Sequence, residues 1–230
     1  MNSNTQLYLN AKLNLPEFGA RLRAMKPKRL TREQSKDQTR ERLLNAANAI
    51  FTKKGYVAAS VEDIAAAAGY TRGAFYSNFG GKAELLLELL RRDHEQMHAQ
   101  VQQIFEAGGT RETMQARALA FYSQFIRTNQ AFMLWAEAKL QAVRDAKFRA
   151  RYNAFMREKI ENMAAIIEQF SAASGTPLLL PAEQLAVGLM GLCDGVQAIH
   201  QADPQFVSVD MTEATLGGFF AYVVLGRAPG

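Results

Sequence analysis

The chain has 230 residues, enough for one large domain or for a small domain joined to a larger one with a sizeable core. Its single cysteine, Cys193, excludes an intramolecular disulfide and a zinc site built from several cysteines, so we expect folding by packing alone in the cytosol. The apolar stretches are shorter than the about 20 residues of a membrane span, and the N-terminus lacks the pattern of a signal peptide. We therefore expect a soluble, cytoplasmic protein.

Positive charge is concentrated in the first third of the chain. Residues 1–82 hold 14 Lys and Arg against 6 Asp and Glu, a net charge of +8. Residues 83–230 hold 13 against 16, a net charge of −3, which gives the overall +5. This asymmetry indicates that the first part meets a polyanion such as DNA, although a solvated basic face would have the same composition.

Residues 1–35 are expected to form a flexible basic arm. Pro16 and Pro27 interrupt any helix there. Most of its charge lies on Arg21, Arg23, Lys26, Lys28, Arg29 and Arg32. A short amphipathic turn on a membrane or a partner is an alternative, and Met25 is an alternative start of translation. We expect the arm to raise affinity for DNA without changing which sequence is preferred.

Residues 36–81 show the pattern of a helix-turn-helix. Apolar residues at spacings of three and four predict a helix over 36–54 that ends at Gly55. Ser60 with Asp63 resembles a capping box and predicts a helix over 61–68. Gly69 permits a sharp turn, and Thr71 is the expected N-cap of a short helix over 72–79.

The remaining segment, residues 82–230, is expected to be helical throughout. The predicted helices cover 82–107, 110–128, 130–141, 145–173, 181–202 and 210–225. No segment has the period-2 alternation of a strand, and Ala, Leu, Met, Gln and Glu dominate. The predicted fold is therefore all-α, with an N-terminal helix-turn-helix domain followed by a larger helical domain.

One stretch, residues 39–86, resembles the DNA-binding domain of the TetR family of transcriptional regulators. It reads TRERLLNAANAIFTKKGYVAASVEDIAAAAGYTRGAFYSNFGGKAELL. The family's order of features is matched, from the basic amphipathic helix through Ala68 and Gly69 to Tyr76 and Lys82. The chain departs from the family in its long N-terminal extension and in Phe75, where Leu or Ile is common. The resemblance implies a homodimer that binds a palindromic operator and a small-molecule effector.

Residue types in the helix-turn-helix suit contact with DNA. Thr71 and Arg72 stand at the end of the short helix that would enter the major groove, with Arg72 as the expected base contact. Tyr76 and Ser77 offer hydroxyls to phosphates, and Lys82 offers a charge at a helix N-terminus. The predicted DNA contacts are Arg40, Ser60, Thr71, Arg72, Gly73, Ala74, Tyr76, Ser77 and Lys82. An apolar stripe of Phe51, Val61, Ile64, Phe75 and Phe79 is assigned to the core, whereas Tyr56 is expected at either the core or a phosphate.

The C-terminal helices are expected, by the same resemblance, to dimerise and to bind a ligand. Gly188, Gly191 and Gly195 lie on one helix face, which favours close helix packing, either within the chain or across a two-fold interface formed by the last two helices. Aromatic and Met side chains exceed what a minimal core needs. The predicted ligand-binding residues are Met97, Phe121, Phe125, Trp135, Phe155 and Gln197.

Other polar residues receive structural interpretations. Asp194 is expected to be buried in a helix-to-helix hydrogen bond, with a ligand contact as the second choice. His94 and His98 are expected to be exposed and provide too few ligands for a metal. Cys193 is expected to be an inert core thiol. No cofactor is expected.

The function expected from these features is a ligand-responsive repressor released from a palindromic operator by an apolar or amphipathic molecule. No phosphate-binding glycine loop, zinc-protease motif or nucleophile elbow is present, so an enzyme is not expected. The alternative is a ligand-independent accessory or architectural DNA-binding protein, and an all-α enzyme or carrier that retains the motif comes third.

Overall fold

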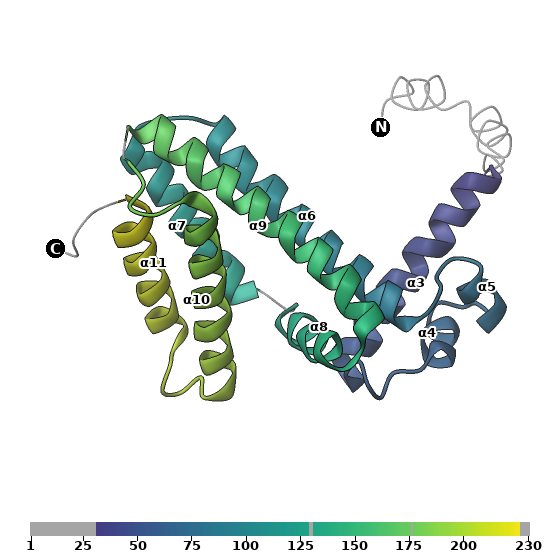
Figure 1. Ribbon diagram of the computed structural model, residues 1–230. Helices are drawn as coiled ribbons and strands as arrows, with labels where there is room; N and C mark the ends of the chain where they lie inside the picture. The colour runs from purple at the N-terminus through teal and green to yellow at the C-terminus, as the bar shows by residue number, and fades with distance from the viewer. Residues whose placement is uncertain (1–30, 129–130, 176, 226–230) are drawn as a thin grey trace, which may run out of the picture. The chain divides into compact units, whose positions relative to one another are not determined.

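The computed structural model describes residues 31–128, 131–175 and 177–225, and each regular element within these ranges is an α-helix (Figure 1). The all-α prediction is confirmed. The helices are α3 (Arg32–Lys54), α4 (Val61–Ala67), α5 (Arg72–Tyr76), α6 (Lys82–Glu106), α7 (Arg111–Thr128), α8 (Phe132–Arg144), α9 (Ala146–Ser174), α10 (Ala182–Ala202) and α11 (Val209–Leu225). Within the described ranges, none of these helices combines the length and apolar character that a membrane crossing requires.

Most helix ends lie within a few residues of their predicted positions, and two differences have local causes. Helix α3 begins four residues earlier than expected because Thr31 and Gln34 form a capping box: the Gln34 amide donates to Thr31 Oγ1 at 3.1 Å, and the Thr31 amide donates to Gln34 Oε1 at 3.0 Å. Helix α5 ends at Tyr76 instead of residue 79, where Ser77 turns its hydroxyl back to the Gly73 carbonyl at 2.9 Å.

The chain divides into two compact units, Met1–Glu41 and Arg42–Gly230, and each is considered by itself. In the first unit the described residues, 31–41, carry the start of α3 and are mostly exposed. The predicted arm to residue 30, together with Met25, lies outside the described residues. The second unit contains both the helix-turn-helix and the later helices. The division into an arm, a DNA-binding domain and a C-terminal domain therefore stays a prediction.

A single core joins the helix-turn-helix to the helices that follow it. Phe75 and Phe79 are 0% and 1% exposed, so their assignment to the core is confirmed. Tyr56 is buried in the same cluster, which places its ring in the core. Leu85, Leu86 and Leu90 of α6 and Phe155 of α9 belong to this cluster as well. The helix-turn-helix consequently packs directly on the elements that reach into the C-terminal part of the chain.

A second core lies between α7, α9 and α10. Met114, Met163, Ile167, Phe170 and Leu185 are buried there. Helices α10 and α11 run side by side, joined by a short connection near Asp203 (Figure 1). Helix α11 also packs against α7, so side chains from distant parts of the sequence meet there.

Candidate DNA-binding site and ligand cavity

The turn between α4 and α5 is built by local sequence signals. The Asp63 amide donates to Ser60 Oγ at 3.0 Å, and the Ser60 amide donates to the Asp63 carboxylate at 3.2 Å, which completes the predicted capping box. Gly69 has φ of +77°, a conformation that side-chain-bearing residues rarely adopt. Thr71 then caps α5 by accepting the Ala74 amide at 3.3 Å. The capping box, the turn at Gly69 and the Thr71 cap lead into the start of α5, where Thr71 and Arg72 are exposed.

Arg72 is the charged residue of α5, and it is largely exposed. About two thirds of its side chain, 66%, is open to solvent. Its guanidinium forms an ion pair with Glu62 Oε1 at 3.1 Å and lies 5.5 Å from the centre of the Tyr76 ring. An exposed pair of this kind is worth at most about 1 kcal/mol, so it can be exchanged for a contact to DNA.

The hydroxyl groups of the predicted site differ in what they can donate. Ser60 and Thr71 use their oxygens to accept backbone amides. The Ser60 hydroxyl also hydrogen-bonds to the Asp63 carboxylate and lowers the pKa of that group, whereas Thr71 keeps its O–H for a phosphate oxygen. Ser77 already donates its O–H to the Gly73 carbonyl, and it would have to rotate to reach DNA. Tyr76 is 48% exposed, and Gly73 is exposed beside a half-buried Ala74. Arg40 is half-buried on α3 in the first unit.

Lys82, a predicted phosphate contact, uses its ammonium within the protein. Its ammonium donates to the carbonyls of Tyr56, Val57 and Ala59 at 2.6, 3.3 and 2.8 Å, and it lies 4.4 Å from the Tyr56 ring centre. Burial lowers the pKa of Lys82, and the Glu137 carboxylate partly offsets this effect. Three internal acceptors occupy the three protons of an ammonium, so we interpret Lys82 as a clamp on the loop before α4.

Glu137 of α8 is a second side chain that contacts the loop before α4. Its Oε1 accepts the Tyr56 amide at 3.2 Å. At Gly55, φ is +78°, and a Cβ would lie 3.1 Å from this oxygen. Glycine is thus needed there for both its conformation and its missing side chain. This contact joins residues 81 positions apart and has no local signal, so the sequence alone did not indicate it.

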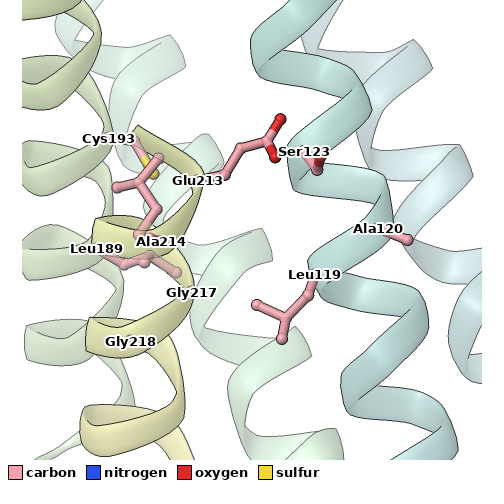
Figure 2. Close-up of a pocket in the computed structure, with 10 residues that line it drawn as sticks. Leu119, Ala120, Ser123, Leu189, Cys193, Glu213, Ala214, Gly217 and Gly218 are labelled. Atoms are coloured by element: carbon pink, nitrogen blue, oxygen red, sulfur yellow. The ribbon is translucent and has the colours of Figure 1, made fainter. Parts of the chain in front are cut away.

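One cavity of about 430 Å³ opens between α7, α10 and α11 (Figure 2). Its lining residues are Leu119, Ala120, Ser123, Leu189, Cys193, Glu213, Ala214, Leu216, Gly217 and Gly218. Its volume falls within the range of small-molecule sites, and its walls are mainly apolar. None of the predicted ligand-binding residues is among those that line it.

The structure places the predicted ligand-binding residues elsewhere. Trp135 and Phe155 are 8% and 1% exposed and stack at 5.9 Å in the core that supports the helix-turn-helix. The Trp135 indole donates to Asp93 Oδ2 at 2.8 Å. Met97, Phe121 and Gln197 are half-buried, and the side chain of Phe125 lies outside the described residues. Residue type alone does not separate a core position from a cavity wall, which explains the difference.

The prediction of an exposed His94 is wrong. Its ring is 5% exposed and lies 5.7 Å from the Phe155 ring, with Nε2 at 3.4 Å from the Asn162 amide nitrogen. Burial lowers the pKa of His94 to about 4, and positive charge from Lys159, His98 and Arg91 adds to this effect against the opposing Glu158. His94 is therefore a neutral core residue at pH 7.

We expect His94 to make folding sensitive to acid. The unfolded chain binds this proton near pH 6.5, above the folded-state pKa of about 4, so stability is complete above pH 6.5 and falls toward pH 4. The loss between pH 7 and pH 5 amounts to about 2 kcal/mol from this group. Urea denaturation at both pH values should show a smaller loss for His94→Gln than for the natural chain. His98→Gln, one turn away, should retain the full loss; an equal loss in all three proteins would contradict the assignment.

Asp194 and Cys193 can also be compared with their expected environments. Asp194 pairs with Lys139 of α8 at 2.7 Å, which agrees with the expected helix-to-helix contact, but its side chain is exposed, so the expected burial is wrong. Burial raises the pKa of the Cys193 thiol to about 11, in agreement with an unreactive thiol. Among the described residues, no cluster of three His, Cys, Asp or Glu side chains is arranged to hold a metal.

Known proteins match part of this chain in sequence. The family described as "Bacterial regulatory proteins, tetR family" matches residues 43–89. The transcriptional activator FasR of Mycolicibacterium smegmatis is 31% identical over 100 residues, which cover 43% of this chain and 46% of FasR. The transcriptional regulator TtgR of Pseudomonas putida is 43% identical over 67 residues, which cover 29% of this chain and 31% of TtgR. The chain thus spans less than half of the length of these relatives.

Solved structures share the fold over most of the chain. A TetR-family regulator from Rhodococcus sp. superposes with a TM-score of 0.68 at 21% identity, covering 82% of this chain and 99% of that one. A transcriptional regulator from Saccharomonospora viridis in complex with choline gives a TM-score of 0.64 at 21% identity, covering 80% and 96%. The match over residues 43–89 identifies this part of the chain as a helix-turn-helix of the TetR family of transcriptional regulators, and the solved structures share the fold of the chain.

Proposed function

We propose that this protein is a homodimeric repressor that binds a palindromic operator and leaves it when a small apolar or amphipathic molecule binds. The observation that carries DNA binding is the start of α5, where Thr71 keeps a free hydroxyl proton and Arg72 is 66% exposed. A short helix presented in this way is suited to reading base edges in the major groove. The complex of the Saccharomonospora viridis regulator with choline supports small-molecule binding by this fold.

The dimer interface is proposed on the outer faces of α10 and α11. Gly188, Gly191 and Gly195 are exposed, and a Cβ added at any of them would meet no atom within 4 Å. Val187 and Ile199 on the same helix are 54% and 55% exposed. Each glycine inside a helix lowers the stability of that helix by about 1 kcal/mol relative to Ala. Three exposed glycines in one helix therefore favour a role in close packing against another helix. Two such faces would form a four-helix interface across a two-fold axis.

Gly191→Arg is expected to convert the dimer into a monomer. The side chain has open space within one protomer, and removing a helical glycine favours the helix, so the protomer should stay folded. It would, however, prevent close approach of a second α10. Light scattering after size exclusion should give the mass of one chain. Gln169→Arg, which adds the same charge on the exposed side of α9, should stay dimeric; dimers in both variants would place the interface elsewhere.

We propose that the loop of residues 55–59 transmits the structural change that releases the protein from DNA. This loop is held by Lys82 at the start of α6 and by Glu137 on α8, so a shift of either helix moves the entry to α4. Both α6, which begins at Lys82, and α8 would therefore act as levers. A coupling of about 1 to 3 kcal/mol between effector and DNA would change operator affinity by about 5-fold to 150-fold.

The experiment that tests this function is selection of bound duplexes from a random pool, followed by footprinting. Enrichment of one palindrome, with two symmetric half-sites protected, supports the proposal. A thermal-shift screen then identifies ligands, which are retested for release of that palindrome. Binding without sequence enrichment would instead favour the accessory or architectural protein, and turnover without DNA binding would favour an enzyme or carrier.

A further inference from the structure

Helix α8 has an apolar stripe on the side that points away from the core. Met133, Leu140 and Val143 are spaced by seven and three residues, so they lie on one side of the helix, and each is more than half exposed. The opposite side is buried in the core through Leu134, Trp135, Ala138 and Ala142. Arg144 and Lys147, next to Val143, have no ion-pair partner among the described residues. An exposed apolar stripe with cations at its edge is typical of a docking surface.

A second exposed apolar group lies at the turn between α10 and α11, residues 203–208, which we call the tip. Asp203 Oδ1 accepts the Phe206 amide at 3.0 Å, and His200 Nδ1 lies 2.7 Å from the Val207 carbonyl oxygen. These contacts order the turn, yet the Phe206 side chain is 76% exposed. An ordered turn that holds a phenyl ring in solvent is suited to place that ring against another surface.

Charge is divided unevenly between the regions that carry the stripe and the tip. Residues 139–159, from α8 into α9, hold seven Lys and Arg against two Asp and Glu. Residues 160–226, which include α10 and α11, hold seven Asp and Glu and no Lys or Arg. When two copies meet through α10 and α11, neither brings a Lys or Arg from these helices, and like charges across an interface oppose association. The basic region around α8 of the second copy supplies the opposite charge.

The stripe borders the dimer interface proposed above. The ion pair between Lys139 and Asp194 places α8 next to the half of α10 that leads into the tip. Asp194 is followed by Gly195, one of the exposed glycines of that interface. Lys139 is followed by Leu140, which belongs to the stripe. A second copy seated on α10 is therefore a neighbour of the stripe as well.

We infer that the apolar stripe of α8 receives the tip of the second copy, with Phe206 against Leu140 and Val143 and the acidic turn next to the cations at the edge of the stripe. The two-fold axis makes this contact twice. The inference rests on the proposed homodimer and adds a contact outside the outer faces of α10 and α11. Because Glu137 of α8 accepts the Tyr56 amide, the tip of one protomer then contacts the helix that holds the loop before α4 in the other.

The first test compares dimer strength in variants that remove the contact from either side. Val143→Asp and Phe206→Ser change side chains that are each 76% exposed in the protomer, so folding should be retained. Each should raise the dimer dissociation constant of the full chain at least about tenfold, measured by analytical ultracentrifugation over a dilution series. The combined variant should dimerise about as weakly as the weaker single variant, because both changes remove one contact. The control is Val57→Asp, another largely exposed valine, which should dimerise like the natural chain.

The second test shows whether the contact joins two copies. Full chains with Lys147→Cys and full chains with Gln205→Cys, carrying tags of different size, are mixed and treated with a short bismaleimide cross-linker. Both positions are exposed, one beside the stripe and one in the tip, so the mixture should give a cross-linked pair of the two chains. Replacing Lys147→Cys by Val57→Cys should give no mixed pair, and neither should the natural chain, whose cysteine is Cys193.

The outcomes separate this inference from the proposed function. Unchanged dimerisation in folded Val143→Asp or folded Phe206→Ser would overturn the inference, as would absence of the mixed pair. Fully additive losses in the combined variant would overturn it too, since the two side chains would then act at separate places. If Gly191→Arg is monomeric in the same assay and the natural chain binds its palindrome, these results leave the proposed function standing. A natural chain that stays monomeric at every concentration would reject the proposed homodimer and the inference together.

Discussion

Replacing Lys82 with Met should destabilise the protein by about 2 to 4 kcal/mol. The variant keeps an unbranched apolar side chain but removes the ammonium that lies over the Tyr56 ring and donates to the carbonyls of Tyr56, Val57 and Ala59. Each buried carbonyl left without a partner costs about 1 to 3 kcal/mol, reduced where water replaces the lost donor. Urea denaturation of the full chain at pH 7 measures the loss.

Lys53→Met is the matched control, because Lys53 is exposed near the end of α3 and should change the stability by less than about 0.5 kcal/mol. Salt dependence of DNA binding distinguishes a clamp from a phosphate contact. If Lys82 is internal, Lys82→Met should leave the slope of log affinity against log salt unchanged. A slope smaller by about 0.9, with stability intact, would instead show that Lys82 neutralises a phosphate.

Arg72→Ala should weaken binding to the selected palindrome by about 1 to 3 kcal/mol, or about 5-fold to 150-fold. Arg72 has the position and the donors for a bidentate contact to a guanine edge, whereas its present ion pair with Glu62 is exposed and weak. The base preference at one position of each half-site should relax at the same time. Competition binding with every single-base variant of the palindrome measures both effects.

Glu62→Gln provides the opposite change at the same ion pair. It frees the guanidinium of Arg72 and removes a negative charge close to the bound DNA, so affinity should increase by up to about fivefold with the base preference retained. If Arg72→Ala weakens the palindrome and random duplexes to the same extent, Arg72 is a phosphate contact. If it changes neither, α5 does not read DNA through this residue.

The sequence by itself determined the elements of the helix-turn-helix. Their signals are local: the spacing of Leu43, Ala47 and Phe51 marks one helix face, and the pairing of Ser60 with Asp63 marks the next helix start. Gly69 is needed at the turn whatever surrounds it, because its backbone conformation excludes most side chains. Burial of Phe75 and Phe79 followed from the same periodicity. Interactions between residues a few positions apart are readable without a tertiary structure.

Only the tertiary structure decided which polar groups are used within the protein and which face solvent. Lys82 was predicted at the DNA from its charge at a helix N-terminus, whereas its contacts with the carbonyls of Tyr56 and Ala59 have no side-chain signature in the sequence. His94 was expected to be exposed and is buried, whereas Asp194 was expected to be buried and is exposed. Burial of a side chain depends on which helix packs opposite it, and the residue type alone does not determine this. The cavity arises where Leu119 of α7 meets Leu189 of α10 and Gly217 of α11, and α7 is far from the other two helices in the sequence. Such contacts depend on the relative placement of whole helices, and the pattern along one helix does not encode them.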